Sequence, residues 1–136
     1  MPSNPYPPPV VSKFLAAATR MPRKRDKTGD CYEAAGKYML DQCLRGCENL
    51  RLVHAEVLGQ GSLQGVTYGH AFVIDGATVI DRSNGRNIRM PKDIYYLIGR
   101  INKLDNIHEY TYQEMGQRML ETGIWGPWDL KTRTGL

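Results

Sequence analysis

Residues 69–81 read GHAFVIDGATVID, two runs of apolar and β-branched residues separated by an Asp-Gly pair. This pattern predicts a β-hairpin with Asp75-Gly76 as its two-residue turn. In that register His70 lies directly opposite Asp81. Because opposed residues share one face of a sheet, we expect the imidazole of His70 to contact the carboxylate of Asp81.

Upstream of the hairpin, residues 29–33 read GDCYE and predict the start of a helix. Asp30 is a typical N-cap and Glu33 is its capping-box partner, so Cys31 is expected to be the first helical residue. Unpaired backbone N–H groups and the helix dipole favour a thiolate at that position. With the imidazole and the carboxylate of the hairpin, this thiol would form a Cys-His-Asp triad for nucleophilic catalysis.

Each of the three residues also has a simpler explanation. Free cysteine is among the most buried residue types, so Cys31 alone is more often a packing residue. His70 alone is more often a structural strand histidine, and Asp81 alone more often closes a turn. The expected register and the expected helix start together favour the triad.

The rest of the chain predicts an α+β domain, with a cysteine-bearing helix packed on a small antiparallel sheet and further helices after it. Helices are expected over 31–45, 91–101 and 112–122, and a half-buried strand over 51–58. Thr111 and Glu114 form a second capping-box pattern, and Gly123 stops that helix. The expected buried positions are Ala34, Tyr38, Leu40 and Leu44 in the first helix, Ile94, Leu97, Ile98 and Ile101 in the second, and Val53, Ala55 and Val57 in the strand. Residues 124–128 are expected to fold back over the core.

Composition favours one globular domain preceded by an arm. The chain has 136 residues, 41% of them hydrophobic and 24% charged, which is ordinary for such a domain. Residues 1–28 are rich in proline and basic side chains, and residues 29–136 form the domain. We find no apolar run long enough for a membrane span and no secretory signal pattern, so we expect no membrane partner and a cytoplasmic location.

The three cysteines, Cys31, Cys43 and Cys47, are expected to be reduced thiols. Cys43 and Cys47 with His54 or Cys31 are an alternative zinc-ligand set, but the paired C-x-x-C spacing is missing. Packing of Cys43 and Cys47 against the sheet is the favoured interpretation. We therefore expect no metal and no cofactor.

The order of these motifs resembles the papain-like superfamily of cysteine peptidases. Within it the chain is most similar to the transglutaminase-like branch and the related bacterial transglutaminase-like cysteine proteinases. The matching residues are Gly29, Cys31 and Tyr32, then His70-Ala71-Phe72-Val73, then Val79-Ile80-Asp81. Phe72 replaces the usual tryptophan and Arg82-Ser83 replaces the usual Pro-Thr, and the match spans residues 29–83.

The resemblance implies acyl chemistry on a protein or peptide substrate, as a thiol peptidase, amidase or acyl transferase. Cys31 would attack the carbonyl carbon, His70 would move the proton and Asp81 would orient the ring. The oxyanion donors implied are the backbone N–H of Cys31, with Gln64 or Tyr68 as candidates. The alternative is a non-catalytic binding module for a protein or nucleic acid, using the basic residues 20–27; these lack interleaved aromatic residues, which does not favour nucleic acid.

Overall fold

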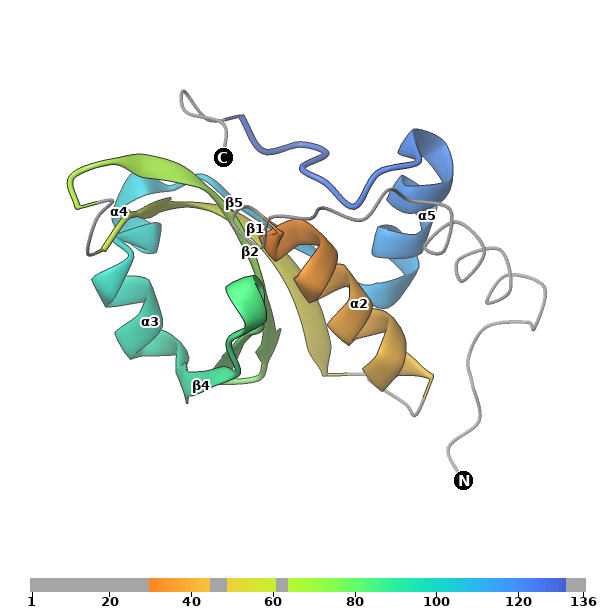
Figure 1. Cartoon of the computed structure of the whole chain (residues 1–136), viewed down its shortest axis with the longest axis horizontal. Helices are drawn as coiled ribbons and strands as arrows, with labels where there is room; N and C mark the ends of the chain where they lie inside the picture. The colour runs from red at the N-terminus through yellow and green to blue at the C-terminus, as the bar shows by residue number, and fades with distance from the viewer. Residues whose placement is uncertain (1–29, 45–48, 61–63, 132–136) are drawn as a thin grey trace.

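The structure, a computed structural model, describes residues 30–44, 49–60 and 64–131. Its centre is a five-stranded antiparallel sheet in the order β4-β3-β2-β1-β5. Helices cover both faces of the sheet, with α2 and α5 on one side and α3 and α4 on the other (Figure 1). The expected α+β class is thereby confirmed. The arm of residues 1–28, including the basic residues 20–27, lies outside the described residues.

The elements follow one another with short connections. In chain order they are α2 (Cys31–Cys43), β1 (Leu50–Leu58), β2 (Thr67–Asp75), β3 (Thr78–Asp81), the 3-10 helix η2 (Ser83–Gly85), β4 (Ile88–Pro91), α3 (Lys92–Ile98), α4 (Ile101–Leu104), β5 (Ile107–Tyr110) and α5 (Tyr112–Thr122). Every neighbouring pair of strands is antiparallel.

The sheet has a separate hydrophobic core on each face. One core joins α2 and α5 to residues such as Leu52 and Val73, and the other joins α3 and α4 to residues such as Phe72. The prediction that β1 is half-buried was therefore wrong. Val53, Ala55 and Val57 do share one buried face, but Leu52 and His54 on the opposite face are fully buried as well. A central strand covered on both sides has no solvent face.

The predicted hairpin is present, but its register differs from the expected one. Asp75 pairs with Thr78, so Gly76 and Ala77 form the turn. Gly76 has φ +60°, and a glycine at the first central position is what a type II′ turn requires. The register is therefore shifted by two residues, which leaves His70 and Asp81 diagonal to one another rather than directly opposed. An even shift keeps every side chain on its predicted face.

Helix α2 starts at Cys31 as expected but buries a different face. Its buried residues are Cys31, Tyr32, Ala35, Gly36, Met39, Leu40 and Cys43. Of the expected positions only Leu40 is buried, and Leu44, at the C-cap, is exposed. The difference follows from the C-terminal segment, because the ring of Trp125 lies against Gly36, where a Cβ would be only 2.5 Å from the ring.

Helix α5 agrees with its prediction at both ends. It runs over Tyr112–Thr122, and the capping box of Thr111 and Glu114 is formed in both directions. Gly123 ends the helix in the left-handed conformation. The following residues fold back over the core as predicted, with Trp125 buried in it.

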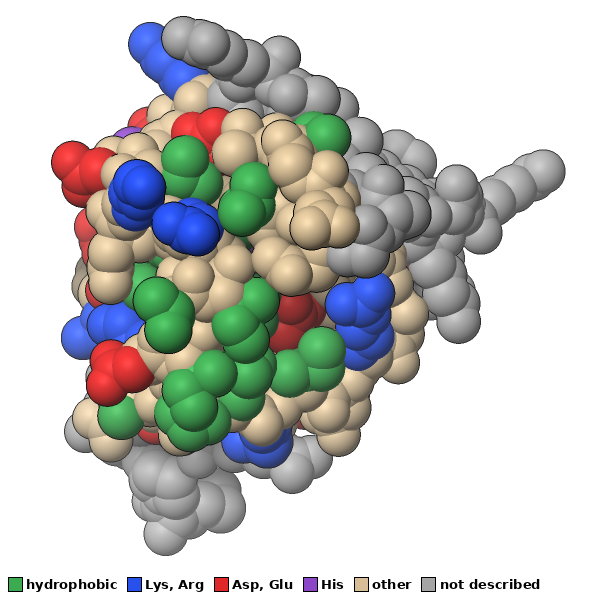
Figure 2. All heavy atoms as spheres, turned by 90° about the vertical axis from the view of Figure 1, so that its left-hand side faces the viewer, with side chains coloured by type: hydrophobic (Ala, Val, Ile, Leu, Met, Phe, Trp, Pro, Cys, Tyr) green, Lys and Arg blue, Asp and Glu red, His purple; other side chains and the backbone are tan. Residues whose placement is uncertain are grey.

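Helix α3 is shorter than predicted and exposes three of the four side chains expected to be buried. The fourth, Ile101, begins α4 and is fully buried as predicted. It ends at Ile98, and Arg100 takes a left-handed conformation before α4 begins. Ile94, Leu97 and Ile98 are exposed, whereas Tyr96 is buried. The helix packs through its two tyrosines, whose rings both lie against Phe72 of the sheet. Figure 2 shows hydrophobic side chains gathered on this side of the molecule.

Cys43 takes part in a disulfide, so the prediction of three reduced thiols was wrong at this position. Three cysteines allow one bridge, and Cys31 is the free thiol in the described part of the chain. Disulfides are typical of oxidising compartments, so this residue gives no support to the expected cytoplasmic location. Among the described residues, no helix has the length and apolarity to cross a membrane.

Candidate active site

The structure places Cys31, His70 and Asp81 around one cavity of about 390 Å³. Cys31 comes from the first turn of α2, His70 from the middle of β2 and Asp81 from the end of β3. All three are largely buried, with exposed fractions of 5%, 9% and 3%. The three predicted catalytic residues are thus brought together from separate elements.

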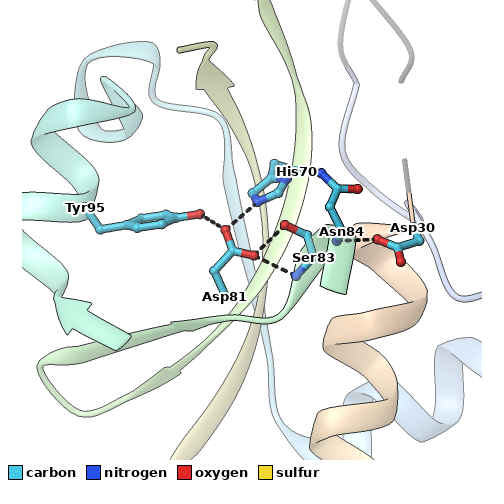
Figure 3. Close-up of polar contacts among 6 residues, drawn as sticks. All are labelled: Asp30, His70, Asp81, Ser83, Asn84 and Tyr95. Carbon is cyan, nitrogen blue, oxygen red and sulfur yellow. Dashed lines mark hydrogen bonds and ion pairs between the residues drawn. The ribbon is translucent and has the colours of Figure 1, made fainter. Parts of the chain in front are cut away.

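The Asp81 carboxylate is held by four hydrogen bonds. Its Oδ2 atom is 2.9 Å from His70 Nε2 and accepts a hydrogen bond of 2.7 Å from the Tyr95 hydroxyl. Its Oδ1 atom accepts from the backbone N–H of Ser83 at 2.9 Å and from the Ser83 hydroxyl at 2.6 Å (Figure 3). Burial alone would raise the pKa of Asp81, but the bonds from His70 and Ser83 outweigh it and hold the pKa below its ordinary value. The carboxylate is therefore ionised at neutral pH.

His70 is held between this carboxylate and the Cys31 thiol. Burial would lower the pKa of His70, but hydrogen bonds with the side chains of Asp81 and Cys31 outweigh it and raise the pKa to about 10. Because Nε2 is engaged with Asp81, Nδ1 is the ring nitrogen left for the thiol. The protonated ring is thus favoured in the folded protein.

The start of α2 is tied to the end of the hairpin, not capped by its own residues. Asp30 is the N-cap, but its side chain makes no capping bond. Its Oδ1 atom instead accepts a hydrogen bond of 2.8 Å from the backbone N–H of Asn84 in η2 (Figure 3). Glu33 forms an ion pair of 3.0 Å with Lys37, so the predicted capping box is absent. The η2 turn therefore fixes the helix start, and with it Cys31, beside Asp81.

Of the two side chains predicted as oxyanion donors, only one lines the cavity. Tyr68 lines the cavity, whereas Gln64 is exposed and does not line it. Two amide side chains that sequence reasoning missed do line it, Gln60 and Asn84. The Gln60 amide donates to backbone carbonyls, including that of Ile98 at 3.1 Å.

Sequence reasoning also missed Ser83 and Tyr95, the residues that hold Asp81. Ser83 could have been found, because a serine two residues after an aspartate commonly donates back to its carboxylate in a turn. Tyr95 gave no such signal. Its role requires that α3 turn its tyrosines toward the sheet, whereas the apolar spacing of the helix predicts that the opposite face is buried.

The alternative zinc set is not assembled among the described residues, and Cys47, one of its members, lies outside them. Cys43 is part of a disulfide and has no thiolate to offer a metal. In the described ranges, no three residues among histidine, cysteine, aspartate and glutamate are grouped as metal ligands. His54 lies on the other face of the sheet from His70, packed against the rings of Tyr32, Tyr110 and Trp128.

No family model, no curated protein and no solved structure matches this chain. The site is therefore interpreted from its own geometry. That geometry comprises a thiol at a helix start, an imidazole favoured in its charged form and a carboxylate held in its ionised form, all facing one cavity.

Proposed function

We propose that this chain is a thiol enzyme of the papain-like superfamily, nearest to its transglutaminase-like branch, that carries out acyl transfer from an amide, isopeptide or thioester bond. The observation that carries the proposal is the hydrogen-bonded series Cys31, His70, Asp81 at the wall of one cavity. Series of this kind recur in nucleophilic enzymes and are recognised by geometry and role.

In the first half of the reaction the Cys31 thiolate attacks the substrate carbonyl carbon and a carbon–sulfur bond forms. The bond to the leaving group then breaks, and the His70 imidazolium gives its proton to the departing nitrogen or sulfur. The products are a thioester on Cys31 and a neutral His70.

In the second half, water or an amine attacks that thioester. His70 takes a proton from the attacking group, the carbon–sulfur bond breaks and the Cys31 thiolate leaves. Hydrolysis and transfer to an amine therefore share one acyl-enzyme and differ only in the acceptor. Asp81 stays ionised throughout, because its function is to orient and stabilise the imidazolium.

The oxyanion that forms on the carbonyl needs hydrogen-bond donors beside Cys31. The backbone N–H of Cys31 belongs to the first turn of α2, where N–H groups have no partner within the helix. The amide of Asn84 lines the same cavity and is exposed, and its backbone is bonded to Asp30 at the helix start. These two groups are the proposed donors, with the Tyr68 hydroxyl at the same cavity as a third candidate.

The test is acylation with p-nitrophenyl acetate, followed by peptide mapping. We expect a burst of nitrophenol and an acetyl thioester on Cys31, both lost in Cys31→Ser and strongly reduced in His70→Ala. His108→Ala, a histidine on β5 away from the cavity, is the matched control and should behave like the parent. Adding a primary amine and measuring how the acetyl group divides between water and amine separates hydrolase from transferase. Acetylation of Cys31 at the rate of an ordinary free cysteine would contradict the proposal.

The alternative of a non-catalytic binding module depends on the basic residues 20–27, which lie outside the described residues. No feature of the cavity favours it over the enzyme.

A further inference from the structure

Much of the lining of the cavity next to Cys31 is apolar. Its lining includes Ile88 and Met90 of β4, Ile98 of α3, and Val57 and Leu58 of β1. Its charged lining residues among those described are Asp81 and His70, which are buried and bonded to each other, and Arg86, which is exposed. A charged side chain entering the apolar part would lose its hydration without a partner.

The apolar lining continues onto the outer face of α3. Ile94, Leu97 and Ile98 are spaced at i, i+3 and i+4, so they share one face of the helix. We name these three residues the apolar ridge. They are 48%, 75% and 47% exposed, and Ile98 belongs both to the ridge and to the cavity wall. Figure 2 shows hydrophobic side chains concentrated on the side of the molecule that carries α3.

The exposure of the ridge is unusual, because a helix normally buries its apolar face. Helix α3, of seven residues, turns that face outward. Isolated exposed apolar residues need no explanation, but a patch that continues into a cleft is typical of a binding groove. A polypeptide extends about 3.3 Å per residue, so a peptide of several residues can occupy the cavity and continue along α3 from Ile98, which belongs to both.

We propose that the acyl donor is a polypeptide with consecutive apolar residues, the side chain next to the reacting carbonyl filling the cavity and the preceding residues lying on the apolar ridge. This inference rests on the proposed function, since it names the substrate class of the same thiol. It distinguishes a peptide-directed enzyme from one that acts on small-molecule amides.

The test compares three alkylating agents at Cys31. Iodoacetamide reports the thiol alone. N-acetyl-Gly-Gly-Leu chloromethyl ketone adds an apolar side chain for the cavity, and the Leu-Leu-Leu chloromethyl ketone adds further apolar side chains for the ridge. We expect saturable labelling of Cys31 by the tri-leucyl agent. Its second-order rate constant should be about tenfold above that of the Gly-Gly-Leu agent, which carries the same reactive group.

Leu97→Ser is the informative variant, because its side chain is the most exposed of the ridge and its loss should not affect folding. It should reduce labelling by the tri-leucyl agent roughly threefold to tenfold and leave labelling by iodoacetamide and by the Gly-Gly-Leu agent unchanged. Leu120→Ser is the matched control, since Leu120 is 49% exposed on α5, on the opposite face of the sheet.

The outcomes separate the two proposals. Unreactive Cys31 toward iodoacetamide would overturn the proposed function and this inference with it. Normal iodoacetamide reactivity with equal labelling by the two peptide agents would overturn the inference and leave the proposed function standing. If Leu97→Ser instead lowered self-association in sedimentation velocity without changing the labelling rates, the ridge would be a contact between copies of the chain and the inference would be wrong.

Discussion

A fall in pH from 8 to 5 should destabilise the folded protein through His54. This side chain is fully buried, and neither of its ring nitrogens has a hydrogen-bond partner in the described part of the chain. Burial first, and the nearby His108 second, lower the pKa of His54 to about 3, with a small opposing effect from Asp129. The unfolded chain takes up this proton below about pH 6.5, whereas the folded chain does not until about pH 3. The contribution of neutral His54 is therefore complete above pH 6.5 and is lost progressively below it.

The size of the effect follows from the distance between pH 5 and the unfolded pKa. At about 1.4 kcal/mol per pH unit over 1.5 units, the loss at pH 5 is about 2 kcal/mol. His70 acts in the opposite direction, because its raised pKa favours the folded state at low pH. A variant is therefore needed to isolate His54, and His54→Leu removes the titrating ring while keeping the site apolar.

The assay is urea unfolding at pH 8 and pH 5 for the parent, His54→Leu and the control His108→Leu. The free energy of unfolding of the parent should fall by about 2 kcal/mol more than that of His54→Leu between the two pH values. The control should behave like the parent. An identical pH dependence in the parent and His54→Leu would refute the account of a buried neutral histidine.

Three substitutions test other parts of the structure. Tyr95→Phe should lower kcat/KM roughly threefold to thirtyfold and the free energy of unfolding by about 1–2 kcal/mol, because it removes a donor from the Asp81 carboxylate. Tyr96→Phe is the control and should change neither quantity, because the Tyr96 hydroxyl is buried without a described partner. Equal effects of the two substitutions would contradict the role of Tyr95. Asn84→Gly, which retains the left-handed backbone seen at φ 55°, should lower kcat about a hundredfold without changing alkylation of Cys31 by iodoacetamide; unchanged turnover would exclude the amide as an oxyanion donor. Gly36→Ala should lower the free energy of unfolding by about 1–3 kcal/mol, because its Cβ would be 2.5 Å from the Trp125 ring; thermal unfolding at the parental temperature would contradict that packing.

The parts of the fold that local chemistry determines could be predicted from sequence. Thr111, Glu114 and Gly123 set both ends of α5 through bonds within a few residues, and the structure has the same ends. The prediction that His70 and Asp81 share one face was correct although the predicted turn was wrong. The side-chain period of a strand is two residues, and the register error was also two residues.

The parts that depend on tertiary packing could not be predicted. Ile94, Leu97 and Ile98 have the spacing of a buried helix face, yet α3 buries Tyr96 instead. Asp30 and Glu33 have the spacing of a capping box, yet Asp30 bonds to Asn84, fifty-four residues later in the chain. In both cases the partner that decides the local structure is remote in sequence, so no local pattern reports it.

The most direct test of the central claim is the pH dependence of Cys31 alkylation by iodoacetamide, measured by peptide mapping without reductant so that the Cys43 disulfide stays intact. If His70 and Cys31 form one charged pair, the parent should react rapidly below pH 7, and His70→Ala should react much more slowly there. Equal rates for the parent and His70→Ala below pH 7 would show that His70 does not activate the thiol and would contradict the proposed enzyme.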